Sequence, residues 1–309
     1  MQNLTSLTVA IPTYNKEHYI KRCIDSVLKQ NMPIKIVVID NQSTDNTWNI
    51  INSYGDEIIK IQNNTNVGMG GNWNKCIDNC STELLMILHA DDELMDGALQ
   101  SYLDFFTSNP EVGLIHAGSI FINEDTHKEF IAVSDSQIIR KHGIDALNKI
   151  IGDANIICSS VIVPKRIYDE VGYFLVDSLS SDIEMWARIG KKYDIGYIMN
   201  NTVRVYVNDS STGKSSLLGR NVDVILKDWD MLNNKMISYY HLSDQKQAKK
   251  YSNKAIIAGL LMIMMAAYSA KQYGKIAQSV YYIFFRYNAL FNPIVWHKFI
   301  SIIKRRFVS

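Results

Sequence analysis

The sequence predicts an α/β fold with a mostly parallel sheet, followed by a helical C-terminal region. Short apolar runs of strand length alternate with segments whose apolar residues recur every three or four positions, as in amphipathic helices. Strands that alternate with helices imply β-α-β crossovers, which place the strands parallel in one sheet. The clearest strand, 84–88, is uncharged and is followed closely by the acidic pair Asp91 and Asp92.

The first hundred residues supply four strand candidates in succession. The run 7–11 is rich in β-branched residues, and we expect Pro12 to stop it. The segment 66–74 is rich in glycine and is expected to be a loop. The remaining strands are expected at 34–39, 58–61 and 84–88. Three helices are expected between them: one at 17–30, one that starts after a cap at Thr44 or Asp45, and one at 75–79.

The second half of the α/β region is expected to start near Phe105. Its strand candidates are 112–118, 156–163 and an edge strand at 201–207, and the polar segment 120–139 is expected to form a hairpin or loop.

From Leu217 onward the chain is expected to be helical. Its uncharged stretch, 255–270, is shorter than the roughly 20 residues that span a bilayer comfortably. A buried helix of a C-terminal bundle is therefore favoured over a membrane segment.

Charge is distributed unevenly along the chain. The net charge is +1 overall, but residues 214–309 carry +11, and no acidic residue follows Asp244. The segments 281–286 and 296–307 combine aromatic residues with positive charge only, which is typical of helices in an anionic membrane interface. Nucleic acid would also attract this charge, but no recognition motif accompanies it. An anionic membrane surface is therefore the expected partner.

Several classes of protein are excluded by missing motifs. There is no P-loop and no G-x-S-x-G nucleophile elbow, and the glycine segment has Trp73 where a dinucleotide fingerprint needs its third glycine. The start of the chain lacks the basic residues of a secretory signal, so a cytoplasmic protein is expected. The cysteines form no C-x-x-C pair and are expected to be reduced core thiols: Cys23, Cys76, Cys80 and Cys158.

The acidic pair is the first candidate for a functional site. Ligands of open α/β sheets bind outside the carboxyl ends of the strands, where Asp91 and Asp92 are expected. Their hard oxygen ligands suit Mg²⁺ or Mn²⁺, which bind through one or two carboxylates and the phosphates of a substrate. The pair alone leaves an alternative open, an acidic first turn of the next helix, which the helix dipole would favour.

Four segments follow one another along the first part of the chain: Val9–Asn15, Val37–Asp45, Asn66–Asn74 and His89–Asp92. In this order and spacing they resemble family 2 glycosyltransferases, which are inverting enzymes of the GT-A fold that use nucleotide sugars. The likeness covers about residues 5–210.

The resemblance implies a nucleotide-sugar pocket, a divalent metal, either Mn²⁺ or Mg²⁺, and a division of the chain. Asp40 is expected to accept a hydrogen bond from the base, usually uracil, Asp91 to contact the ribose, and Asp91 and Asp92 to hold the metal. The expected parts are a GT-A domain at 1–215, with a nucleotide-sugar half at 1–104 and an acceptor half at 105–215, and a basic helical region at 216–309. The expected pocket residues are Pro12, Thr13, Tyr14, Asn15, Asp40, Asn41, Ser43, Gly68, Gly70, Gly71, Asn74, His89, Ala90 and Asp91.

Some positions depart from the family's pattern. The family often has Asp where this chain has His89 and Arg where it has Trp73, so metal ligation falls to the aspartates and base recognition to stacking or backbone groups. The family commonly has His where this chain has Asn208, which leaves the third metal ligand undecided. Lys214, a little further on, is expected either to close over the diphosphate or to lie in a solvated loop.

Asp182 is the expected catalytic base. It opens an expected helix at 182–190, where it is either a helix cap or the carboxylate that takes a proton from the acceptor hydroxyl. The segment resembles the family's Glu-Asp motif, with Ser181 in place of the Glu. Glu184 is the alternative base.

The expected function is an inverting glycosyltransferase that uses a UDP-sugar donor and a metal that assists the departure of UDP. The acceptor is expected to be a glycan linked to polyprenyl diphosphate, at the inner face of the cytoplasmic membrane. The alternative is a non-catalytic module that binds a nucleotide sugar or glycan on the same fold. A nucleotidyltransferase is disfavoured, because no glycine- and arginine-rich phosphate loop lies near the N-terminus. The sequence does not identify the sugar, the linkage or the oligomeric state.

Overall fold

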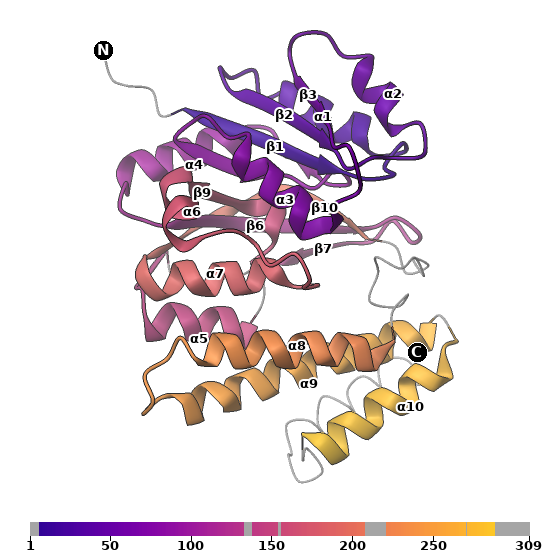
Figure 1. The fold of residues 1–309 in the computed structure, drawn as a ribbon, viewed down its shortest axis with the longest axis vertical. Helices are drawn as coiled ribbons and strands as arrows, with labels where there is room; N and C mark the ends of the chain where they lie inside the picture. The colour runs from indigo at the N-terminus through magenta and orange to yellow at the C-terminus, as the bar shows by residue number, and fades with distance from the viewer. Residues whose placement is uncertain (1–5, 133–137, 154–155, 208–220, 270, 288–309) are drawn as a thin grey trace.

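A ten-stranded mixed sheet forms the centre of the computed structural model, which describes residues 6–132, 138–153, 156–207, 221–269 and 271–287 (Figure 1). The strand order is β3-β2-β1-β4-β9-β6-β10-β5, with β7 paired to β6 and β8 paired to β10. The strands are β1 Leu7–Thr13, β2 Lys35–Asp40, β3 Ile59–Gln62, β4 Leu84–Ile87, β5 Glu93–Leu94, β6 Leu114–Asn123, β7 Glu129–Ala132, β8 Ile139–Arg140, β9 Val161–Pro164 and β10 Ile195–Val207.

The first four strands pair in parallel, as the alternation of strands and helices predicts. β9 then runs antiparallel to β4 and β6, and β10 runs parallel to β6. The prediction of an α/β fold with a mostly parallel sheet and a helical C-terminal region is confirmed.

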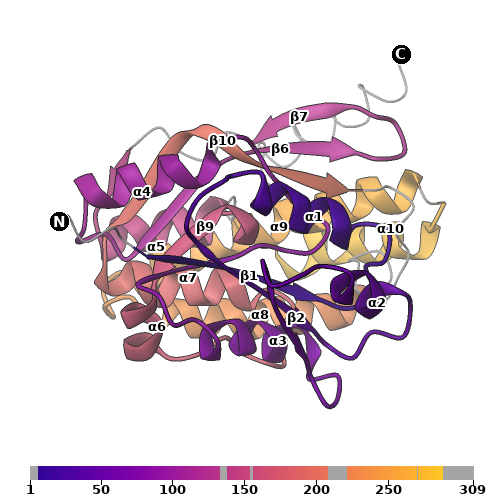
Figure 2. The same ribbon diagram turned by 90° about the horizontal axis from the view of Figure 1, so that it is seen from above.

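Helices cover both faces of the sheet, because alternate residues of a strand point to opposite sides. Leu7, Val9 and Ile11 of β1 face one core with α1, α2 and α4, whereas Ala10 faces a second core with α3, α5, α6 and α7. Figure 2 shows α1 and α4 on one side of the sheet and α3 and α6 on the other. The helices are α1 Ile20–Leu28, α2 Thr47–Asn52, α3 Gly68–Asp78, α4 Ala98–Ser108, α5 Ile144–Asp153, α6 Lys165–Val171, α7 Ser181–Lys192, α8 Val222–Ile237, α9 Gln245–Ser269 and α10 Tyr273–Tyr281, with single turns η1 Cys158–Ser160 and η3 Tyr282–Arg286.

Pro12 does not stop β1, which continues to Thr13 and pairs Pro12 with Ile39 of β2. The position of the ladder explains why. The carbonyl oxygen of Ala10 accepts a hydrogen bond from the N–H of Leu88 on the β4 side of the strand, and the backbone nitrogen of Pro12 points to the same side. β4 pairs with β1 only as far as Ala10, so the N–H that proline lacks is not needed there.

Other expectations need correction. The segment 66–74 is a loop only at its first two residues, since α3 begins at Gly68. β10 is not an edge strand, because β6 pairs on one side and β5 and β8 pair on the other. Asp91 and Asp92 are not the first turn of a helix, since β5 follows them and α4 begins only at Ala98. The hairpin expected within 120–139 is present as β6 and β7.

The C-terminal helices pack on one another. Stretch 255–269 lies in α9 and shares a core with α8 and residue Ile283. Gly259 lets the two helices approach, since a Cβ there would lie 2.5 Å from the ring of Trp229. This packing agrees with the bundle helix predicted from the sequence. Among the described helices, none has the length and apolar character needed to cross a membrane.

All four cysteines are free and buried, as expected of core thiols. The segment 296–307 lies outside the described residues. The boundaries at 104 and 215 remain predictions.

Candidate functional site

A cavity of about 810 Å³ opens at the carboxyl ends of β1, β2 and β4. Open parallel sheets bind ligands at this edge. The ends of two distant strands, β6 and β10, supply the opposite wall through Glu124, Tyr206 and Val207. The remaining lining residues are Pro12, Thr13, Tyr14, Asn15, Lys16, Tyr19, Asn41, Met69, Asn72, Trp73, His89, Ala90 and Asp91.

The loop after β1 is held to the loop after β2. Asn15 has a left-handed φ of 52°, a conformation that asparagine tolerates better than most residues. Its N–H donates to Ser43 Oγ at 2.9 Å, and its Oδ1 accepts from the N–H of Thr44 at 2.8 Å. The N–H of Lys16 donates to Thr47 Oγ1 at 2.7 Å. These bonds fix the backbone on which Tyr14 and Lys16 reach the cavity.

Asp40 lies beneath this loop rather than in the cavity lining. Its side chain is fully buried, and its carboxylate accepts hydrogen bonds from Ser43 and from Gln62 Nε2, the latter at 2.9 Å. Asn41, the next residue, does line the cavity. Its amide is itself engaged, because Oδ1 accepts from Asn63 Nδ2 and from the N–H of Val67 at 2.9 Å each.

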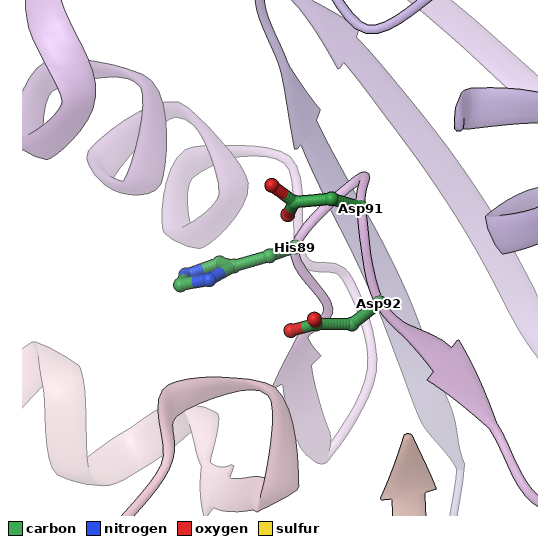
Figure 3. A group of neighbouring side chains, drawn as sticks. All are labelled: His89, Asp91 and Asp92. Atoms are coloured by element: carbon green, nitrogen blue, oxygen red, sulfur yellow. The ribbon is translucent and has the colours of Figure 1, made fainter. Parts of the chain in front are cut away.

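Three side chains gather in the loop after β4. Figure 3 shows His89, Asp91 and Asp92 projecting to the same side of that loop. Their ligand atoms all lie within 4.8 Å of one another. One imidazole and two carboxylates at this spacing form a donor set that fits a divalent metal ion.

The two aspartates have opposite electrostatic surroundings. Burial raises the pKa of Asp91, but the Lys16 ammonium, whose Nζ lies 2.5 Å from Asp91 Oδ2, acts together with His89 and a backbone hydrogen bond and lowers it overall. Burial and the neighbouring Asp91 raise the pKa of Asp92 to about 7. Ser159 Oγ donates to Asp92 at 2.5 Å, which orients that buried carboxylate. A divalent cation would favour the ionised form of both groups.

His89 and Trp73, the two departures from the family's usual residues, are in contact. Their rings stack with centroids 5.3 Å apart and an interplanar angle of 13°. Burial lowers the pKa of His89, so its imidazole is neutral near pH 7 and can act as a ligand. His89 Nε2 and Thr13 Oγ1 are buried and have no hydrogen-bond partner among the described residues. Both residues line the cavity, so these atoms are available to a ligand.

None of the glycines of the third segment is in the cavity lining, and Gly70 is needed for packing instead. A Cβ on Gly70 would lie 2.5 Å from the carbonyl oxygen of Leu175, so the close approach of α3 to this loop requires glycine. Asn74 exchanges two hydrogen bonds with the backbone of Phe174, at 2.9 and 3.0 Å. The cavity is reached instead by Met69, Asn72 and Trp73, which share this helix. Gly68 and Gly71 are also absent from the lining.

Asp182 lies in the first turn of α7 and is not part of the cavity lining. Burial raises the pKa of its carboxyl group to about 6. The thiol of Cys158 has its pKa raised by burial and then by the negative charges of Asp182 and Asp92, which places both carboxyl groups near that sulfur. Asp182 and the aspartate pair therefore share one region of the molecule.

Glu184 faces a different part of the structure. It is fully buried, and it accepts hydrogen bonds from Arg188 Nε at 3.0 Å and from the hydroxyl of Tyr239. Lys235 Nζ in α8 lies 3.4 Å from it. This side chain connects α7 to the C-terminal helices.

Several residues that line the cavity are not predicted from the sequence, and two residues that are predicted lie outside the described part of the chain. Lys16 directly follows the expected pocket segment, and this position in the sequence is the one signal that could have identified it as a pocket residue. Tyr19 lies just before α1, close to the expected pocket segment, whereas Glu124 and Tyr206 come from elements distant in sequence, and no motif marks any of the three. Asn208 and Lys214 lie in the stretch 208–220, outside the described residues.

Comparison with known proteins gives consistent results. The profile described as Glycosyl transferase family 2 matches residues 8–172. The GalNAc(5)-diNAcBac-PP-undecaprenol beta-1,3-glucosyltransferase of Campylobacter jejuni is 25% identical over 214 residues, which cover 66% of this chain and 65% of that protein. The abequosyltransferase RfbV of Salmonella typhimurium is 26% identical over 187 residues, which cover 54% of this chain and 55% of that protein.

The fold has solved counterparts. A crystal structure of S. aureus TarS 1-349 in complex with UDP-GlcNAc aligns with a TM-score of 0.64 and 16% sequence identity, over 86% of this chain and 73% of that chain. At this identity the likeness concerns the fold alone.

Proposed function

The chain belongs to glycosyltransferase family 2, and on that basis we propose that it transfers a sugar from a UDP-sugar to a hydroxyl group of a lipid-linked glycan, with inversion at the anomeric carbon. The observation that carries the proposal is the cavity at the carboxyl ends of β1, β2 and β4, which is lined by His89 and Asp91 and by unpartnered polar atoms. The carboxylate of Asp92 lies within 4.8 Å of their ligand atoms, just outside the lining. The donor class is supported by TarS, which has been crystallised with UDP-GlcNAc and with UDP.

The loops after β1 and β2 are assigned to the nucleoside. Tyr14 is 44% exposed at the cavity and offers an aromatic face for stacking, and Thr13 Oγ1 offers a hydrogen bond. Asp40 acts indirectly in this proposal, because its carboxylate holds Ser43, which in turn holds Asn15. Asn41, which lines the cavity, contributes to the wall of the nucleoside pocket.

Asp91, Asp92 and His89 would hold Mn²⁺ or Mg²⁺ together with the diphosphate of the donor. When bound, the metal neutralises charge that develops on the departing UDP. Asp91 has to exchange Lys16 for the metal, and Lys16 is then free to approach a phosphate oxygen. The neutral imidazole of His89 supplies a nitrogen ligand or a hydrogen bond to the diphosphate.

Asp182 is assigned as the general base. The acceptor hydroxyl gives its proton to the Asp182 carboxylate while its oxygen forms a bond to the anomeric carbon. The bond from that carbon to the diphosphate oxygen breaks, and its electron pair leaves with UDP. Attack opposite the leaving group inverts the anomeric centre. A pKa of about 6 suits a base near neutral pH, because the carboxylate is ionised yet more basic than an exposed aspartate.

The acceptor is proposed from chemistry and from one relative. The C. jejuni relative's name specifies an undecaprenol diphosphate glycan, and the C-terminal region of this chain is strongly basic. A lipid-linked glycan at the cytoplasmic face of the membrane accounts for both. We also propose that residues 1–215 form the transferase domain and 216–309 the membrane-facing region.

Donor hydrolysis and binding across UDP-, GDP- and dTDP-sugars, with and without Mn²⁺, test this function. We expect metal-dependent selection of one UDP-sugar. A protein that binds a nucleotide sugar but never releases free UDP, with or without lipid-linked acceptors, would instead be a non-catalytic binding module. The absence of any nucleotide-sugar binding would refute the transferase function and leave only a glycan-binding module on the same fold.

A further inference from the structure

A second cavity, of about 440 Å³, lies at the N-terminal half of α9. Polar and basic residues form its walls, and no acidic residue is among the described residues that line it. The chain contains no acidic residue after Asp244, so the rest of α9 offers no counter-charge. The lining residues are Ser243, Lys246, Gln247, Lys250, Tyr251 and Lys254.

The three lysines share one face of the helix, because they are spaced four residues apart. All three are exposed, and none forms an ion pair with another described residue. Like charges at this spacing destabilise a helix. Lys254 Nζ lies over the ring of Tyr251, 5.9 Å from its centroid, but no carboxylate of the described residues pairs with any of the three lysines, so this face favours an anion from outside the molecule.

This lysine face points away from the protein. Ala248, Ser252 and Ile256 are buried at 0%, 2% and 4% exposure, and each lies two residues after one of the lysines. Two residues correspond to about 200° around a helix, so the buried and lysine faces are opposite. In Figure 1, α9 lies along the edge of the molecule farthest from β2 and β3, with α8 beside it.

The extent of the face indicates the kind of anion. Lys246 and Lys254 are eight residues apart, which is about 12 Å along a helix. One phosphate group cannot contact side chains over that distance, whereas a row of lipid headgroups can. Leu242, just before the helix, is 88% exposed and adds an apolar group at the same end. An apolar side chain beside a row of lysines is typical of a surface that lies in a membrane interface.

We propose that the lysine face of α9, together with Leu242, docks this protein onto a bilayer of anionic lipids. The inference rests on the proposed function only for its biological setting, since vesicle binding requires neither donor nor acceptor. It assigns membrane contact to an element different from the aromatic C-terminal segments singled out in the sequence.

The test is co-sedimentation of the full-length protein with phosphatidylglycerol-containing vesicles and with phosphatidylcholine vesicles. The variant Lys246→Gln/Lys250→Gln/Lys254→Gln removes the proposed contact. Each lysine near an anionic surface contributes about a fivefold factor, so binding is expected to fall roughly a hundredfold. The control Lys29→Gln/Lys35→Gln/Lys128→Gln removes the same charge from exposed positions elsewhere and is expected to bind within about threefold of the parent. Leu242→Ser removes an apolar contact and not a charge. We therefore expect it to weaken vesicle binding through a contribution that does not depend on the salt concentration.

Three results would overturn the proposal. The triple α9 variant binding like the parent would assign the contact elsewhere, and equal binding to both vesicle types would remove the role of charge. Displacement by inorganic diphosphate, but not by sodium chloride of equal ionic strength, would make this a site for a soluble phosphate. Donor hydrolysis in vesicle-free buffer is measured on the same samples. Its absence in parent and variants alike would refute the transferase function and leave the vesicle result standing.

Discussion

Asp92 is buried and Asp182 is half-buried, and both carboxyl groups have raised pKa values, but the causes differ. Burial alone raises the pKa of Asp182, whereas Asp92 is also affected by the negative charge of Asp91. A bound cation would cancel the second effect and leave the first. The two residues therefore suit different tasks, Asp182 as a proton acceptor and Asp92 as a metal ligand.

Asp182→Asn is the direct test of the base. The amide keeps the shape of the side chain but accepts no proton, so turnover is expected to fall by about 10²- to 10⁴-fold while UDP affinity stays unchanged. The exposed Asp177→Asn on the preceding loop is the control, and it should leave turnover unchanged. Full turnover by Asp182→Asn would remove this residue from the mechanism.

The pH profile gives a second readout of the same group. Because the pKa of Asp182 is raised to about 6, its carboxylate form predominates above that pH and disappears below it. We expect turnover at saturating substrate to fall about tenfold per pH unit below about 6. A profile measured from pH 4.5 to 8.5 that stays flat through this range would contradict the assignment.

Lys16 competes with a metal for Asp91 in the proposed site. Its ammonium is partly exposed, so the pair is worth about 1 kcal/mol, or roughly fivefold in affinity. Lys16→Met is therefore expected to bind Mn²⁺ about fivefold more tightly in the absence of nucleotide, as measured by calorimetry. Lys21→Met breaks the comparable Lys21–Asp25 pair on α1, at 2.7 Å, and serves as the control. Weaker Mn²⁺ binding by Lys16→Met would show that Lys16 does not compete.

At the scale of elements, the site is built from loops that hold one another. The loop after β1 is bonded to the loop after β2, α3 is bonded to the segment after α6, and Ser159 in η1 supports the aspartate pair. Each contact joins residues that are far apart in sequence. The cavity is therefore preorganised by hydrogen bonds in which a side chain holds either a backbone group or another side chain.

Glu184 in α7 illustrates a buried charge whose role is to join elements. Glu184→Gln removes the negative partner of Arg188 and Lys235, and because both cations are partly exposed we expect a loss of roughly 2 kcal/mol in unfolding free energy. Chemical denaturation measures the loss. Glu170→Gln, which breaks the exposed pair with Lys192 at 2.8 Å, should change stability little. If folded Glu184→Gln protein is inactive, Glu184 rather than Asp182 becomes the candidate base.

At the scale of the whole molecule, the cavity joins the first strands to the ends of β6 and β10, so a ligand there contacts both halves of the sheet. Ligand binding to the folded state alone raises stability by mass action. With UDP and Mn²⁺ at about 100 times their dissociation constants, we expect the melting temperature to rise by roughly 5 °C. UDP with EDTA should give a much smaller rise, and equal rises would mean that the metal is not part of the site.

The sequence by itself determined the α/β class, the first four strands, the bundle helix within α9 and the family. These features depend on local patterns of apolar residues and on four ordered motifs, which need no knowledge of distant contacts. Even there, the prediction that Pro12 stops the first strand is wrong, because whether a proline ends a strand depends on how far the neighbouring strand extends.

The tertiary structure decided which residues face the cavity. Asp40 and Asn41 are adjacent and both buried, yet only Asn41 lines the cavity, because successive residues of an extended backbone point to opposite sides. The contact between His89 and Trp73, the pairing of Lys16 with Asp91, and the contribution of Glu124 and Tyr206 all depend on elements brought together by folding. Local sequence carries no signal for such contacts, since each depends on how strands and helices pack across the sheet.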